Sequence, residues 1–378
     1  MTGTVLPRLC RALGIAALVA ACSSMPAPTP TPFSTAVATT APLGSPAPAS
    51  TNFQVARPSP TTDTSGPWLV YQTAESSPRI HLARPDGSED HVLVIGSHPD
   101  WSPDGQWIAY EADSADIWII RIDGTDARRL FDCEDPCILG DSAAWSPDGR
   151  EIAFTTADGI GNVAATATIK SVNVETGSVR TLVETVGPDY PFYPRWSPDG
   201  RQLVLSIQRF ATTKVDDCSP VGTAVAVVDL DAAQPAPRFL TAFPMYADYP
   251  DWSPDGTTIV FTTYDLGTRE FNCSLDPAQP SDLYTIHADG SDLTQLTHNP
   301  TGPALIRPVG ASQRGTASGP LAAQPTWSPD GLKIVYVYVD GFAWPGAHPW
   351  IMDRDGANRR ALGAVFPAAG EHPRLRPL

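Results

Sequence analysis

The sequence predicts an all-β protein, a six-bladed β-propeller closed by its C-terminal strand and preceded by a disordered tether. Three observations predict this architecture. One turn motif occurs five times, the residues after each copy have the composition of short strands, and the end of the chain matches the segment that begins the first complete repeat.

The repeated motif is the pentapeptide Trp-Ser-Pro-Asp-Gly, and repeats at such spacing indicate a solenoid or a propeller. Its copies occupy residues 101–105, 145–149, 196–200, 252–256 and 327–331. Proline has the φ that the second position of a type I turn requires, and glycine at the fourth position tolerates positive φ. Each copy is therefore expected to connect two antiparallel strands, a and b.

A second hairpin follows in each repeat. Residues 117–122 form a β-rich run that ends in the turn Asp-Gly-Thr-Asp at 123–126, and similar turns occur at 289–292 and 355–358. A fourth short run follows the turn. Four short strands with a tryptophan in the first are typical of a propeller blade.

The ends of the repeat region predict how the ring closes. Residues 68–95 contain strands b, c and d without a strand a. The missing strand is predicted at the C-terminus, because His372-Pro373-Arg374-Leu375 aligns with His98-Pro99-Asp100-Trp101. This closure gives six blades over residues 67–378 and buries the sheet edges that an open array would expose.

The N-terminus predicts export. Residues 1–21 resemble a lipoprotein signal peptide, with two arginines followed by an apolar stretch shorter than the ~20 residues that span a bilayer. The stretch ends Val19-Ala20-Ala21-Cys22, which resembles the bacterial lipobox, and this resemblance implies lipidation of Cys22. An ordinary secretory signal with a chance cysteine is the alternative. We therefore expect an extracytoplasmic, membrane-anchored lipoprotein of the periplasm or cell surface.

The segment 22–66 is the predicted tether. It is rich in proline, threonine, serine and alanine, with two aromatic residues and two charges. Such a segment cannot bury enough apolar surface to offset the entropy lost on ordering, and its prolines favour an extended form. We expect it to separate the propeller from the membrane.

The charge balance excludes two classes of partner. The chain has 41 acidic against 25 basic residues, a formal net charge of −16. A sequence-independent nucleic-acid binder needs a basic face, and binding to anionic lipid by charge needs one too. We expect no nucleic-acid partner, no cofactor and a monomer.

The Trp-Ser-Pro-Asp-Gly repeat resembles the WD-like repeat of the TolB family, whose propeller has six blades. The resemblance covers residues 67–378 and implies a module of the cell envelope. Similar propellers occur as gating domains in prolyl peptidases and tricorn-type proteases, and in oligogalacturonide lyases. This chain differs from TolB in having a tether where TolB has an α/β domain.

The long connections all fall on one predicted face of the propeller, because each joins strand b to c or strand d to a. They are residues 132–142, 209–221, 264–281, 298–324 and 339–348. Loop variation on a rigid scaffold usually carries binding. We expect this insertion face to bind an envelope protein, peptide or glycan. The alternative is that loop length varies freely during evolution and that the long loops share a face by chance.

Four cysteines remain once Cys10 and Cys22 are assigned to the signal and the lipid. The predicted compartment permits disulfides. The simplest of the three possible pairings joins the two cysteines of one loop to each other, and joins the two cysteines in loops of adjacent blades to each other. A zinc site would need two more ligands that the sequence does not supply at matching spacing. The expected disulfides are Cys133–Cys137 and Cys218–Cys273.

The residue before each tryptophan position lies on strand a, the strand nearest the central channel. These residues are Asp100, Ala144, Arg195, Asp251, Thr326 and Arg374. The four charged ones are predicted to bind a polar or charged ligand at the channel mouth. The alternative is that they neutralise one another around a water-filled channel.

No catalytic signature such as Gly-x-Ser-x-Gly occurs. Four histidines could face one surface and form a lyase-like metal site, although scattered polar loop residues explain them more simply: His98, His298, His348 and His372. The leading hypothesis is a non-enzymatic binding or scaffold module, with no catalytic and no metal residues. An envelope polysaccharide lyase or hydrolase acting at the channel mouth is the alternative, and a partner subunit of a peptidase is a third interpretation.

Overall fold

The computed structural model describes eleven stretches of the chain, all in its C-terminal five-sixths. They are residues 65–73, 77–112, 116–133, 137–158, 167–185, 188–210, 220–264, 281–299, 321–339, 347–363 and 370–377. The signal peptide, Cys22 and nearly all of the tether lie outside these residues, as do Cys218, Cys273 and most of the insertion segments.

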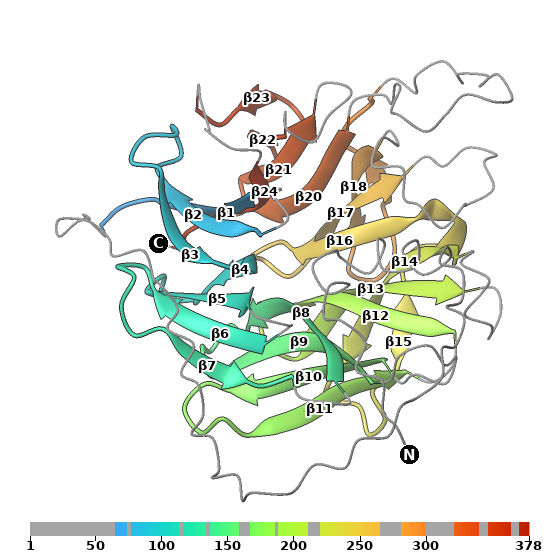
Figure 1. Ribbon diagram of the computed structural model, residues 1–378. Coiled ribbons are helices and arrows are strands. Elements are labelled where there is room, and N and C mark those ends of the chain that lie inside the picture. The colour runs from blue at the N-terminus through green and yellow to red at the C-terminus, as the bar shows by residue number, and fades with distance from the viewer. Residues whose placement is uncertain are drawn as a thin grey trace, which may run out of the picture.

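The described residues form antiparallel sheets arranged in a ring (Figure 1). Four sheets have four strands each. The first contains β24 (Gly370–Leu375), β1 (Leu69–Thr73), β2 (Arg79–Ala83) and β3 (His91–Ile95). The second contains β4 (Ser97–Trp101), β5 (Trp107–Ala112), β6 (Asp116–Arg121) and β7 (Arg128–Phe131). The third contains β8 (Cys137–Trp145), β9 (Glu151–Asp158), β10 (Ala167–Asn173) and β11 (Val179–Thr185). The fourth contains β12 (Asp189–Trp196), β13 (Gln202–Phe210), β14 (Pro220–Asp229) and β15 (Pro237–Phe239).

The remaining strands pair as one eight-stranded sheet. They are β16 (Ala247–Trp252), β17 (Thr258–Tyr264), β18 (Ser281–His287), β19 (Thr294–Gln295), β20 (Leu321–Trp327), β21 (Lys333–Val339), β22 (His348–Asp353) and β23 (Arg360–Ala361). A parallel pairing of Ser281 with Leu321 joins β18 to β20. Strand pairing therefore gives four four-stranded sheets and one larger sheet, and the expectation of six separate blades is corrected in this respect.

The predicted closure by the C-terminal strand is confirmed. Strand β24 pairs antiparallel with β1, with Leu375 opposite Leu69 and Arg374 opposite Val70. The backbone N–H of Arg376 continues the ladder by donating to the carbonyl of Trp68 at 2.8 Å. The two ends of the described chain are thus joined in one sheet.

The repeated turn has a local physical cause. In the first copy, the Ser102 hydroxyl donates to Asp104 at 2.6 Å and accepts the backbone N–H of Trp107 at 2.9 Å. The same carboxylate accepts the backbone N–H of Gln106 at 3.0 Å. Equivalent serine–aspartate bonds of 2.6–2.7 Å occur in the other four copies. Serine and aspartate are therefore needed to close the turn.

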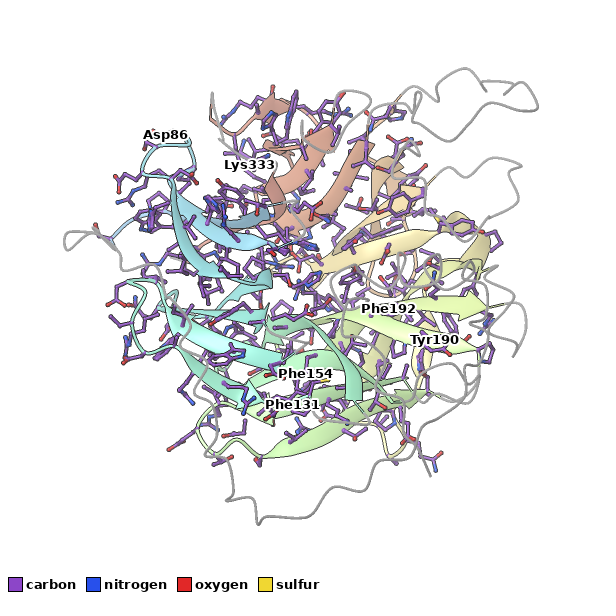
Figure 2. The ribbon with its side chains drawn as sticks, in the orientation of Figure 1. Asp86, Phe131, Phe154, Tyr190, Phe192 and Lys333 are labelled. Atoms are coloured by element: carbon purple, nitrogen blue, oxygen red, sulfur yellow. The ribbon has the colours of Figure 1, made fainter. Side chains whose placement is uncertain are left out.

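The core lies between neighbouring sheets. One buried cluster joins Ile117 and Ile119 of β6 to Trp145 of β8 and Phe154 of β9. Figure 2 shows Phe131 of β7 beside Phe154, with ring centroids 4.6 Å apart. On the five a strands that contain it, the tryptophan packs one sheet against the preceding one. Among the described residues, no helix is long and apolar enough to cross a bilayer.

Candidate functional site

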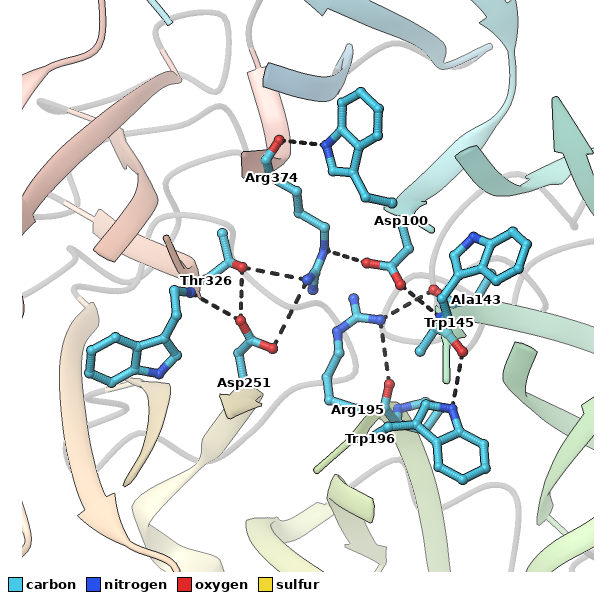
Figure 3. A network of polar contacts seen from close by, with 12 residues as sticks. Asp100, Ala143, Trp145, Arg195, Trp196, Asp251, Thr326 and Arg374 are labelled. Atoms are coloured by element: carbon cyan, nitrogen blue, oxygen red, sulfur yellow. Dashed lines mark hydrogen bonds and ion pairs between the residues drawn. The ribbon is translucent and has the colours of Figure 1, made fainter. Parts of the chain in front are cut away.

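The four charged residues predicted for the channel mouth lie together on the innermost strands of their sheets (Figure 3). Arg374 on β24 places its Nε 3.3 Å from Oδ1 of Asp100 on β4. Its Nη1 lies 4.0 Å from Oδ1 of Asp251 on β16. One guanidinium therefore faces two carboxylates from two other sheets.

The second oxygen of each carboxylate binds the next sheet. Asp100 Oδ2 accepts the backbone N–H of Trp145 at 2.8 Å. Asp251 Oδ2 accepts the backbone N–H of Trp327 at 3.1 Å and the Thr326 hydroxyl at 2.8 Å. These bonds give both aspartates a structural role in joining neighbouring sheets. Ligand binding by the charged residues stays a prediction.

Arg195 lies on β12 and also contacts the neighbouring sheet. Its Nη1 donates to the carbonyl of Ala143 at 3.2 Å and to that of Pro194 at 3.4 Å. Figure 3 shows the Arg195 and Arg374 side chains directed toward each other from different strands.

A second ring of residues in the channel was not predicted as a ring from the sequence, which singled out only His98 and His372 among its members. These residues lie three positions before each tryptophan, or before Leu375, and all have φ between 49° and 61°: His98, Ser142, Tyr193, Tyr249, Gln324 and His372. We call them the bulge residues, because strand pairing shifts register at each of them. A bulge redirects a side chain, and a left-handed non-glycine residue costs about 1–3 kcal/mol. Five of the six precede proline, and that shared neighbour is the sequence signal that could have identified them.

Four bulge residues form an aromatic cluster in the channel. The rings of Tyr193 and Tyr249 stack with centroids 4.3 Å apart, and their hydroxyls lie 3.1 Å apart. The rings of His98 and His372 meet edge to face at 4.6 Å. Tyr249 lies 5.7 Å from His372 and joins the two pairs.

The contacts of His372 are those of a neutral imidazole. The Gln324 side-chain oxygen accepts the backbone N–H of His372 at 2.8 Å, so the Gln324 amide nitrogen faces Nε2 of His372 at 3.3 Å. An amide nitrogen only donates, so this arrangement suits an Nε2 that accepts. Burial, together with the positive charges of His98, Arg195 and Arg374, holds the pKa of His372 well below its ordinary value.

Bulge residues, prolines and the residues before the tryptophans line one small pocket. Its lining consists of Tyr193, Arg195, Tyr249, Pro250, Gln324, Pro325, Thr326, His372, Pro373 and Arg374. We call it the channel pocket. It is bordered by two arginines, two stacked tyrosines and three prolines.

Carboxylates gather at the other end of the innermost strands. Glu111 accepts from His98 Nδ1 at 2.9 Å, and Gln72 donates to Glu371 at 3.2 Å. Burial raises the pKa of Glu371. Pairing places Ser97 opposite Glu111 and Trp101 opposite Ile108, so the turn motif and the b–c connection lie at opposite ends of the strand. The predicted charged ring is therefore at the turn end, away from the predicted insertion face.

Among the other candidate residues, Cys133, His298 and His348 are not part of the channel pocket. Cys133 is buried and disulfide-bonded, whereas its pairing with Cys137 stays a prediction because that side chain is not described. His298 and His348 are exposed, unlike the His98–His372 pair. Among the described residues, no group of three histidines, cysteines or carboxylates is arranged to hold a metal ion.

Comparison with known proteins supports the fold. No family model matches the chain. An uncharacterized protein of Agrobacterium fabrum, Atu1656, is 26% identical over an alignment of length 269 that covers 54% of this chain and 86% of that protein. The structure of TolB from Acinetobacter baumannii superposes with a TM-score of 0.56 at 19% identity, covering 83% of this chain and 67% of that one. A putative TolB from Agrobacterium tumefaciens gives 0.53 at 18% identity, covering 82% and 99%. The chain therefore has a TolB-like propeller fold.

Proposed function

We propose that this protein is a lipid-anchored, extracytoplasmic β-propeller that acts as a binding or scaffold module of the cell envelope for a protein, peptide or glycan. The observation that carries the proposal is the channel pocket. It gathers two arginines, two tyrosines and a neutral histidine from innermost strands that are far apart in sequence.

The proposal includes a six-bladed ring. Within the eight-stranded sheet, β16–β19 and β20–β23 are two antiparallel sets joined by a parallel contact at Ser281 and Leu321. The bulge also recurs six times, once on the innermost strand of each set. Both features support six repeats of one unit, with adjacent edges of two blades in contact.

The composition of the pocket favours binding over structural filling. Tyrosine and arginine are enriched where proteins bind partners, and small-ligand sites combine apolar walls with a few polar groups. The channel pocket has this composition.

The experiment is capture of partners from detergent-solubilised envelope with the purified full-length chain as bait. A channel variant, Arg195→Ala, is compared with a surface variant, Arg360→Ala, which removes the same charge from exposed β23. Loss of a specific partner in the channel variant alone supports the proposal. Equal capture by both variants contradicts the channel site. Shortening of an envelope polysaccharide by the wild type but not by Arg195→Ala supports the lyase or hydrolase alternative instead.

A further inference from the structure

We infer that the channel pocket binds a carboxylate group and that Arg195 and Arg374 hold it. This inference rests on the proposed binding function and names the chemistry of the ligand.

The groups that line the pocket are donors more than acceptors. Both guanidinium groups are part of the lining, whereas Asp100 and Asp251 are not. The two carboxylates flank Arg374, and their second oxygens accept backbone N–H groups of adjacent sheets, as Figure 3 shows. Both oxygens of each carboxylate are therefore engaged within the protein, and the charged side chains that border the pocket itself are arginines.

The field at the back of the pocket agrees with this arrangement. His372 belongs to the lining, and its pKa is lowered first by burial and then by the charges of His98, Arg195 and Arg374. A neutral His372 adds no charge of its own. A carboxylate placed between the two arginines would be stabilised by the same field that disfavours an imidazolium.

The geometry of arginine suits a carboxylate. A guanidinium presents parallel N–H donors that match the two oxygens of a carboxylate, which a point charge such as lysine does not reproduce. In Figure 3 Arg195 and Arg374 approach each other from different strands, and both border the same pocket. A carboxylate between them would accept N–H groups from both.

The walls indicate what carries the carboxylate. The stacked Tyr193–Tyr249 pair and the rings of Pro250, Pro325 and Pro373 border the arginines. These surfaces favour a flat or apolar group attached to the carboxylate. The chain as a whole has a net charge of −16 and does not attract anions in general. Binding of an anion would therefore indicate a local positive site such as this pocket.

Titration calorimetry of the full-length chain tests the inference with three probes of one shape. Benzoate supplies a ring and a carboxylate, benzamide is its uncharged analogue, and benzylamine is cationic. We expect benzoate to bind roughly tenfold or more tightly than benzamide, since hydrogen bonds to charged groups contribute more than neutral ones. Equal affinity for benzoate and benzamide, or preference for benzylamine, would overturn the inference. Sulfate that binds as tightly as benzoate would overturn the assignment to a carboxylate.

Variants locate the site. Arg195→Gln should weaken benzoate roughly tenfold or more, and Arg360→Gln should leave its affinity unchanged. Because Arg195→Gln could disturb folding, the wild type provides a second measurement: bound benzoate should raise the pKa of His372, followed by NMR of its imidazole. An unchanged His372 titration at saturating benzoate would contradict the inference.

The two proposals can fail separately. Partner capture that depends on Arg195 but is not displaced by benzoate would overturn the carboxylate inference and leave the binding function intact. Benzoate binding that depends on Arg195, with capture unaffected by the variant, would overturn the channel as the partner site and leave the inference intact.

Discussion

Arg374 on the closing strand lies between Asp100 and Asp251, with Nε 3.3 Å from an oxygen of the first and Nη1 4.0 Å from an oxygen of the second. The carbonyl of Arg374 also accepts the Trp101 indole N–H at 3.0 Å. The C-terminal strand is thus bound across the channel as well as within its own sheet. Ring closure and the candidate site share one residue.

Replacing Arg374 by methionine keeps the apolar stem and removes the charge. The side chains of Arg374 and Asp100 are 16% and 11% exposed, so the aspartates would be left largely buried beside a neutral group. Removal of one partner from a buried pair is strongly destabilising, and we expect a loss of about 2–3 kcal/mol in the free energy of unfolding. Chemical denaturation measures it. The exposed Arg360→Met variant is the control, and equal stability of the two variants would contradict the role of Arg374.

His372 predicts a pH dependence whose sign follows from its lowered pKa. The folded state disfavours the imidazolium, so the unfolded chain binds the extra proton. Stability contributed by neutral His372 is present above the ordinary histidine pKa of about 6.5 and is lost as pH falls below it. Denaturation at about pH 7 and about pH 5 should show lower stability at the acidic value.

The matched variants for this pH effect are His372→Asn and His298→Asn. Asparagine tolerates the left-handed backbone of residue 372 but does not titrate. The first variant should lose stability less steeply than the wild type between the two pH values, and the second, at an exposed position, should behave as the wild type does. Parallel curves for all three proteins would show that His372 does not act this way.

Deleting residues 370–378 removes β24 and leaves the edge of β1 without its partner. An unpaired strand edge invites association with other chains, and Gly66 and Gly105 would lose the Arg376 side chain that donates to their carbonyls. We expect aggregation or loss of cooperative melting, measured by light scattering and calorimetry. A truncated monomer that melts as the intact chain does would refute closure as a source of stability.

Lipidation is predicted at Cys22 from the boundary Val19-Ala20-Ala21-Cys22. The thioether-linked lipid would hold the chain at a membrane, and serine cannot form that linkage. Cys22→Ser should therefore move the protein from the membrane fraction to the soluble fraction, followed by immunoblotting. Retention of the variant in the membrane fraction would remove the basis for the anchor.

A disulfide is predicted between Cys218 and Cys273, both of which lie outside the described residues. The chain-entropy model assigns a disulfide that closes the loop from residue 218 to residue 273 a stabilisation of the folded state of roughly 4 kcal/mol. Peptide mapping without reduction should recover one peptide that joins the two cysteines. Free thiols at both positions, or a peptide that joins either one to Cys133, would show that the insertions are arranged differently.

The sequence by itself determined the elements that depend on short-range chemistry. Each Trp-Ser-Pro-Asp-Gly turn closes through bonds within six residues, as between Ser102, Asp104 and Trp107, so a local motif was sufficient to predict it. The closing strand was also predictable, because β24 repeats the sequence pattern of β4. Equal positions in the repeat further indicated that Asp100, Arg195, Asp251 and Arg374 share one ring.

Only the tertiary structure decided which residues meet across the channel. Tyr193 and Tyr249 are 56 residues apart and Gln324 and His372 are 48 apart, so no local preference relates them. The bulge that turns them inward is a left-handed backbone state before proline, which is unfavourable in isolation and is held by the surrounding sheets. The pairing of Arg374 with two aspartates, the neutral state of His372 and the joining of β18 to β20 likewise depend on distances between sheets, which composition and spacing do not encode.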